Sequence, residues 1–171
     1  MVPHILASGL GVMALISAIT VFGTAVGNTE DRRGPGPGNS TRHACASADR
    51  ELATKVSEID RASYGETPVA RFLAAEFGMT EEAIITEKKD LGASWGNLTI
   101  AHTLAASDKQ GMTAAQVLQL HDRGMRWGQV AAGLHLKLDD AVRAMDAEGR
   151  VARGLVKADG KPEQITRSDR G

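Results

Sequence analysis

Histidine and cysteine are the residue types in this sequence best able to do chemistry, and they occur five times and once, respectively. His43 and Cys45 form a His-x-Cys pair, but two ligands without a further cluster of cysteine or histidine make a weak metal site. We therefore predict no bound metal and no cofactor. Because Cys45 has no second cysteine to pair with, the chain cannot form an intramolecular disulfide.

Two histidines stand close enough to acidic residues to have the imidazole oriented for acid–base catalysis. These pairs are His121 with Asp122 and His135 with Asp139. No nucleophile stands at a recognisable spacing from either pair, and the sequence contains no phosphate loop, dinucleotide fingerprint or haem attachment motif. We predict that the protein is not an enzyme, and a small hydrolase built on a His–Asp pair is the alternative.

A tryptophan followed at once by a glycine occurs twice, at Trp95–Gly96 and at Trp127–Gly128, and the chain has no other tryptophan. A glycine inside a helix costs about 1 kcal/mol relative to alanine, so each glycine needs a reason. Without a side chain, a neighbouring helix can approach closely and the indole can lie across the contact. We expect packing. The alternative is that these four residues line a groove for a peptide, a glycan or a second copy, because tryptophan is enriched at interfaces.

The two Trp-Gly pairs belong to a longer internal duplication, which covers residues 78–107 and 111–142. Each copy contains Gly-Met-Thr, a helical stretch, a glycine stop, Trp-Gly and a second helical stretch. In the second copy, Thr113 and Gln116 predict a capping box. Each copy is therefore predicted to be a pair of helices. Two copies are too few for a self-supporting array, so flanking helices must close the core.

The first 27 residues are predicted to be a signal peptide or a membrane anchor. Residues 5–26 are apolar and carry no charge, and the run is long enough to cross about 30 Å of hydrocarbon. Both interpretations place the rest of the chain outside the cytoplasm. Arg32 and Arg33 follow the run, however, and this bias favours the opposite orientation. Leader cleavage and membrane orientation therefore stay open.

The remaining boundaries follow from composition. Residues 28–46 are rich in glycine and proline and are predicted to be a linker. Residues 47–148 are predicted to form an all-α domain, a small multi-helix array, and residues 149–171 a mostly disordered tail with a net charge of +3. The first helix of the domain is expected from residue 47 to about residue 62, on an apolar stripe of Ala48, Leu52, Val56 and Ile59.

Charge argues against a polyanionic partner. The whole chain has a net charge of −1, and residues 67–148 contain eight basic and eleven acidic residues. This balance gives no general attraction to nucleic acid. We expect the partner to be a protein or another envelope component, or a second copy of the chain, with the membrane as a further partner through residues 5–26 if they are not cleaved.

Two resemblances bear on the repeats. The stretch "VLQLHDRGMRWGQVAAGLHLKLDDAVRAM", residues 117–145, resembles the tri-helical helix-turn-helix of LuxR-type regulators and sigma-factor region four. In those proteins the third helix enters the major groove, but here it opens with Asp139 and Asp140, which phosphate would repel. The patterns "GMRWGQVA" and "GASWGNLT" resemble tandem Trp-Gly segments of small exported bacterial proteins, a family that supplies no activity or site residue.

We therefore expect a non-enzymatic, exported or membrane-anchored helical protein that acts in protein–protein interaction or as a structural module of the envelope. The competing expectation is a membrane-tethered regulator that keeps a degenerate DNA-binding helix-turn-helix.

Overall fold

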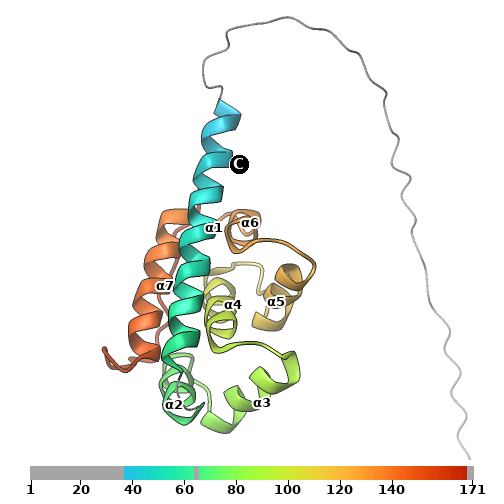
Figure 1. The fold of residues 1–171 in the computed structure, drawn as a ribbon. Helices are drawn as coiled ribbons and strands as arrows, with labels where there is room; N and C mark the ends of the chain where they lie inside the picture. Colours follow the sequence, from blue (N-terminus) through green and yellow to red (C-terminus); the bar gives the residue numbers. More distant parts are fainter. Residues whose placement is uncertain (1–36, 64–65, 169–171) are drawn as a thin grey trace, which may run out of the picture. The chain divides into compact units, whose positions relative to one another are not determined.

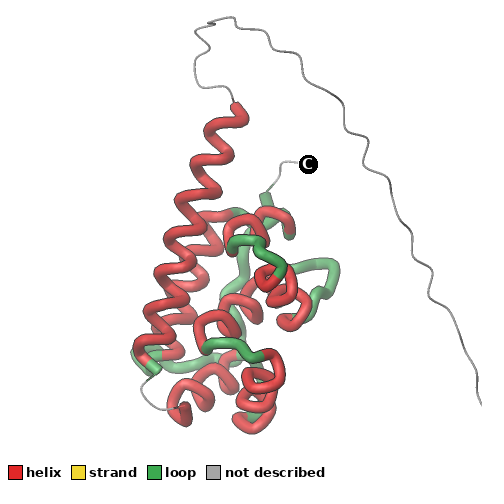
Figure 2. Tube along the Cα trace, turned by 45° about the vertical axis from the view of Figure 1, so that its right-hand side comes forward, coloured by secondary structure: helices red, strands yellow, loops and turns green. Residues whose placement is uncertain are grey.

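A long first helix packs against three of the other six helices (Figures 1 and 2). The computed structural model describes residues 37–63 and 66–168, and in them it has seven helices and no extended strand. The helices are α1 (Pro37–Ala62), α2 (Glu66–Glu76), α3 (Glu81–Leu91), α4 (Trp95–Ser107), α5 (Ala114–Asp122), α6 (Trp127–Gly133) and α7 (Leu138–Ala152). The all-α prediction is confirmed for this part of the chain.

The apolar stripe of α1 is buried, as its spacing predicts. Leu52 and Ile59 are almost fully inaccessible, and Ala48 and Val56 are also buried. This face of α1 packs against α4, α6 and α7. Helix α7 runs parallel to α1 (Figure 1). Two contacts in the same order along both helices show this: Lys55 Nζ lies 2.7 Å from Asp146 Oδ1, and further along, Ile59 lies next to Gly149.

Local signals set the ends of several helices where the sequence predicts them. The Thr80 and Ser94 hydroxyls accept the backbone N–H groups of Ala83 and Asn97, both at 3.1 Å, and so cap α3 and α4. The capping box of Thr113 and Gln116 is present at the start of α5. These caps need contacts only three residues along the chain, which is why the sequence alone predicts them.

The first helix begins at Pro37, ten residues before its expected start, so the prediction of a linker over residues 28–46 is wrong for residues 37–46. Pro37 occupies the first helical position, where its missing N–H does no harm. Gly38 is the only glycine of the helix, and residues 39–63 contain neither glycine nor proline. The predicted signal peptide or anchor at residues 1–27 lies outside the described residues. Of the helices in residues 37–63 and 66–168, none is long and apolar enough to cross a membrane.

The prediction of a disordered tail over residues 149–171 is also wrong for the part that the structure describes. Residues 149–152 complete α7, and residues 153–168, here called the C-terminal strap, pack against the helices. Ile165 is buried, and its N–H donates to Ser107 Oγ at 2.9 Å. The strap contains few apolar residues, but side chains of the helices accept its backbone N–H groups. Such long-range polar contacts leave no compositional signal.

Candidate functional site

Trp95 and Trp127 begin α4 and α6, and each side chain is only 4% exposed. Gly96 and Gly128 are buried beside them. The four residues that the sequence offers as a binding groove therefore lie in the contact between α1 and the first turns of α4 and α6. This burial favours the packing interpretation of the Trp-Gly pairs.

The two glycines allow close approach to α1. A Cβ atom on Gly96 would lie 2.3 Å from the Val56 carbonyl oxygen, a distance that real Cβ atoms do not reach. A Cβ atom on Gly128 would lie 2.6 Å from Asp49 Oδ1 and 3.0 Å from the Cys45 carbonyl oxygen. Each glycine is therefore needed because the backbone or a side chain of α1 occupies the space of a side chain.

A carboxylate of α1 accepts a hydrogen bond from each of these glycines. The Gly96 N–H donates to Asp60 Oδ1 at 2.7 Å, and the Gly128 N–H donates to Asp49 Oδ1 at 2.6 Å. The first N–H groups of a helix have no partner within the helix, and its N-terminus favours a negative charge. Asp49 and Asp60 thus cap α6 and α4 from a different helix.

Asp49 and Asp60 are not among the residues predicted from the sequence, although a signal for them exists. Asp49 and Asp60 are eleven residues apart, as are Cys45 and Val56, which lie one turn before them. Eleven residues make three helical turns, so equivalent positions return to the same face of α1. A spacing of eleven on one helix could have been matched to the two Trp-Gly pairs.

The preceding helix of each pair covers the outer side of the indole. Lys88 Nζ, from α3, lies 5.2 Å from the centre of the Trp95 ring, a cation–π contact. The His121 ring, from α5, stacks on Trp127 with a centroid distance of 4.1 Å and an interplanar angle of 14°. Each buried indole is thus contacted by a polar side chain of the preceding helix.

The histidines of the repeats lie in three different surroundings. His121 Nδ1 is 2.9 Å from the Met125 carbonyl oxygen, in addition to its stacking on Trp127. His102 Nε2 is 2.8 Å from Glu87 Oε2, and its ring stacks on Phe77. His135 is exposed and has a left-handed backbone with φ of 58°. The first two are bound to neighbours that hold the ring in place, which indicates a packing role.

Metal binding finds no support in residues 37–63 and 66–168, where no group of three or more histidine, cysteine or acidic residues could hold an ion. His43 and Cys45 both lie on α1. Residues two apart on a helix do not face each other, so this pair cannot converge on one ion.

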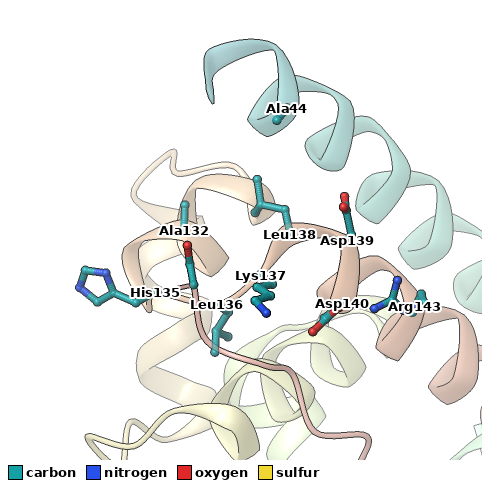
Figure 3. Close-up of a pocket in the computed structure, with 10 residues that line it drawn as sticks. Ala44, Ala132, His135, Leu136, Lys137, Leu138, Asp139, Asp140 and Arg143 are labelled. Atoms are coloured by element: carbon teal, nitrogen blue, oxygen red, sulfur yellow. Dashed lines mark hydrogen bonds and ion pairs between the residues drawn. The ribbon is translucent and has the colours of Figure 1, made fainter. Parts of the chain in front are cut away.

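A surface hollow of 620 Å³ lies where α7 begins (Figure 3). Its lining includes His135 and Asp139, the second of the predicted His–Asp pairs, but their side chains point in different directions. A hydrogen bond with the Thr166 side chain lowers the pKa of Asp140, and the charge of Arg143 adds to this effect. Asp140 thus contributes to holding the strap against α7 through Thr166.

Two buried carboxyl groups hold the strap at the other end of α7. Glu148 Oε1 accepts the Glu163 N–H at 2.8 Å, and Glu76 Oε2 accepts the Asp159 N–H at 3.2 Å. Glu148 is 1% exposed, and its Oε2 atom has no hydrogen-bond partner. Burial raises its pKa to about 7, and the nearby charges of Glu76, Glu163 and Asp159 add to the rise. Burial also raises the pKa of Glu76.

Comparison of the chain with protein-family models, with curated proteins and with solved structures finds no match.

Proposed function

We propose that this protein is a non-enzymatic helical module that is exported or anchored to the membrane and binds a protein, another envelope component or a second copy of itself. The observation that carries the proposal is the charge-free apolar run at residues 5–26. The helical body adds support, because its indoles and two of its histidines are used in packing. Such a body is suited to binding a partner through its surface.

We also propose that residues 78–107 and 111–142 are two copies of one helix pair, each helix-turn-helix-like, that dock on α1. The support is the shared set of contacts: an α1 carboxylate on the glycine N–H, a glycine against α1, and a covered indole. Three turns of α1 separate the two docking positions, which matches a repeated unit.

The alternative of a DNA-binding regulator is less well supported. Helix α7 corresponds to the helix that would enter the major groove, but it packs against α1, α2, α4 and α6. Its first turn carries Asp139 and Asp140, which phosphate would repel. We therefore expect no salt-dependent binding of duplex DNA.

The test of the proposal is a pair of reporter fusions at the C-terminus of the full chain. Alkaline phosphatase, which is active only outside the cytoplasm, should be active, and a cytoplasmic reporter should be inactive. A matched variant with Leu15→Arg and Ile16→Asp interrupts the apolar run and should reverse both results, because charge disfavours insertion into hydrocarbon. Activity of the cytoplasmic reporter alone in the unaltered chain would refute export and favour the tethered regulator.

A further inference from the structure

Leu155 and Val156, here called the apolar tip, are the only large hydrophobic side chains exposed in the part of the chain that the structure describes. Their exposed fractions are 65% and 46%. They follow a glycine turn at the end of α7, in which the N–H groups of Gly154 and Leu155 donate to Val151 and Arg150 carbonyls at 2.8 and 2.9 Å. In such turns the residue after the glycine frequently packs against the helix. Leu155 instead points largely into solvent.

The backbone of this turn is held in place by α2. Gly154 has φ of 69°, and a Cβ atom there would lie 2.7 Å from the Phe72 ring. The guanidinium carbon of Arg71 lies 5.1 Å from the centre of the same Phe72 ring, a cation–π contact. The turn is at the end of the body where α1 ends and α2 begins, and Figure 1 shows the strap, in red, turning outward there. The apolar tip is therefore a projecting feature on a fixed base.

Several exposed cations lie near the apolar tip. The exposed cations nearest to it along the chain and on its base are Arg150, Arg153, Lys157 and Arg71. Among the nearby acids, Glu76 and Glu148 are buried and Asp146 is paired with Lys55 at 2.7 Å, whereas Asp159 is exposed in the strap. These four exposed cations outnumber Asp159 and Glu163, the exposed acids of the strap, although the whole chain has a net charge of −1.

We propose that the apolar tip and its cations bind the surface of an anionic lipid bilayer. Two aliphatic side chains on a projecting turn give far less contact area than the roughly 800 Å² per partner of a stable protein interface. Shallow insertion of apolar side chains beside several cations, by contrast, is enough for reversible binding to anionic lipid. This inference deepens the proposed function and rests on it for the placement of the body beside a membrane.

The test uses the full chain, reconstituted into vesicles of phosphatidylcholine alone or with phosphatidylglycerol added. Cys45→Ser removes the native thiol, and Val156→Cys carries a dye whose emission shifts to the blue in lipid. The shift is expected only with phosphatidylglycerol, and a quencher attached to the lipid should reach the dye. Arg153→Glu with Lys157→Glu should reduce the shifted fraction by about threefold or more, because each cation contributes to binding. The same dye at Gln119→Cys, an exposed site on α5, is the control and should not shift.

Three outcomes would overturn the inference: a dye at residue 156 that stays in water on both vesicles, an equal shift at residue 119, or a shift that depends on protein density and not on lipid charge. The last outcome would instead indicate contact between copies. Because the dye reports local contact with lipid in a reconstituted system, its result is independent of the reporter fusions, and failure of one proposal can be distinguished from failure of the other.

Discussion

Two regions of the body use the same hydrogen bond, from a backbone N–H to a carboxylate, in opposite surroundings. On α1, Asp60 and Asp49 accept the N–H groups of Gly96 and Gly128. Each carboxylate is only partly buried and lies at the N-terminus of a helix, where the unpaired N–H groups and the helix dipole favour its charge. Here the surroundings and the hydrogen bond stabilise the same state of the carboxyl group.

Under the C-terminal strap the surroundings oppose the charge. Glu148 and Glu76 accept the N–H groups of Glu163 and Asp159, but both are buried and all four residues are acidic. Burial and the neighbouring carboxylates favour the protonated form, as the raised pKa values of Glu148 and Glu76 indicate. The contribution of Glu148 and Glu76 under the strap to stability therefore depends on pH.

The largest effect is expected from Gly96→Ala, which tests the docking of α4 on α1. The new Cβ would overlap the Val56 carbonyl group, which is backbone and cannot move without shifting α1. We expect the free energy of unfolding to fall by about 3 kcal/mol or more, measured by urea denaturation. At Gly128 the nearest atom belongs to the flexible Asp49 side chain, so Gly128→Ala should lower it by only about 1–2 kcal/mol.

Gly133→Ala is the matched control for both variants. Gly133 also lies in a helix, but a Cβ atom there meets nothing within 4 Å. Alanine should stabilise the protein by up to about 1 kcal/mol through helix propensity. Equal effects at all three glycines would mean that close approach to α1 does not explain the Trp-Gly pairs.

The next effect concerns Glu148, whose pKa is raised from 4.5 to about 7 in the folded protein. Below pH 4.5 the carboxyl group is protonated in both states, and its contribution to stability is complete. As the pH rises to about 7, the unfolded chain releases the proton and the folded protein keeps it. Stability therefore falls over this window, by about 3 kcal/mol at 1.36 kcal/mol per pKa unit.

Glu148→Gln should remove this loss, so that the variant gains about 3 kcal/mol over the native protein between pH 4.5 and pH 8. Urea denaturation of both proteins across this range measures the difference. Asp146→Asn, which changes a partly exposed carboxylate on the same helix, is the control and should not produce the gain. A difference between the native protein and Glu148→Gln that does not change with pH would contradict the assignment.

The comparison also separates what the sequence could predict from what it could not. The caps at Thr80, Ser94 and Thr113 depend on residues three positions along, and the buried stripe of α1 depends on helical spacing, so both are local patterns. The Trp-Gly pairs also stand out, because a helical glycine beside a large side chain needs a packing reason.

The contacts that join distant segments could not be predicted in this way. Asp49 and Asp60 look like ordinary polar residues of an amphipathic helix until α6 and α4 are placed against them. The strap looks disordered because Ile165 is its one buried large apolar residue among residues 153–168, and carboxyl groups of α2 and α7 accept two of its backbone N–H groups. Only the fold brings those groups together.

A smaller effect is expected from Asp60→Ala and Asp49→Ala, which leave a buried glycine N–H without a partner. Each substitution should lower stability by about 1–2 kcal/mol, but the two should affect different parts of the body. Helix α4 keeps its own cap at Ser94 and has nine buried residues, so Asp60→Ala should lower the stability of the whole body. Helix α6 spans seven residues, and its N-cap, Arg126, makes no side-chain cap hydrogen bond.

Asp49→Ala should therefore open α6 locally. Amide hydrogen exchange in residues 127–133 should speed up before exchange elsewhere, and Trp127 emission should move to the red in a Trp95→Phe background. Trp95 emission in a Trp127→Phe background is the control and should not change. Uniform faster exchange across all helices would show instead that the two docking positions are equally coupled to the core.

The smallest effect gives the sharpest contrast, because one chemical change should have opposite signs in the two regions. Asp60→Asn keeps the oxygen that accepts the Gly96 N–H but removes the charge that the N-terminus of α4 favours, so it should cost about 0.3–1 kcal/mol at pH 8. Glu148→Gln removes a charge that burial opposes, so at the same pH it should stabilise. Urea denaturation of both variants at pH 8, with and without salt, measures the two signs; salt should shrink the loss at Asp60 more than the gain at the buried Glu148. If both amides destabilise, the hydrogen bond itself and not the surrounding field determines the contribution of these carboxylates, and the distinction between the two regions is lost.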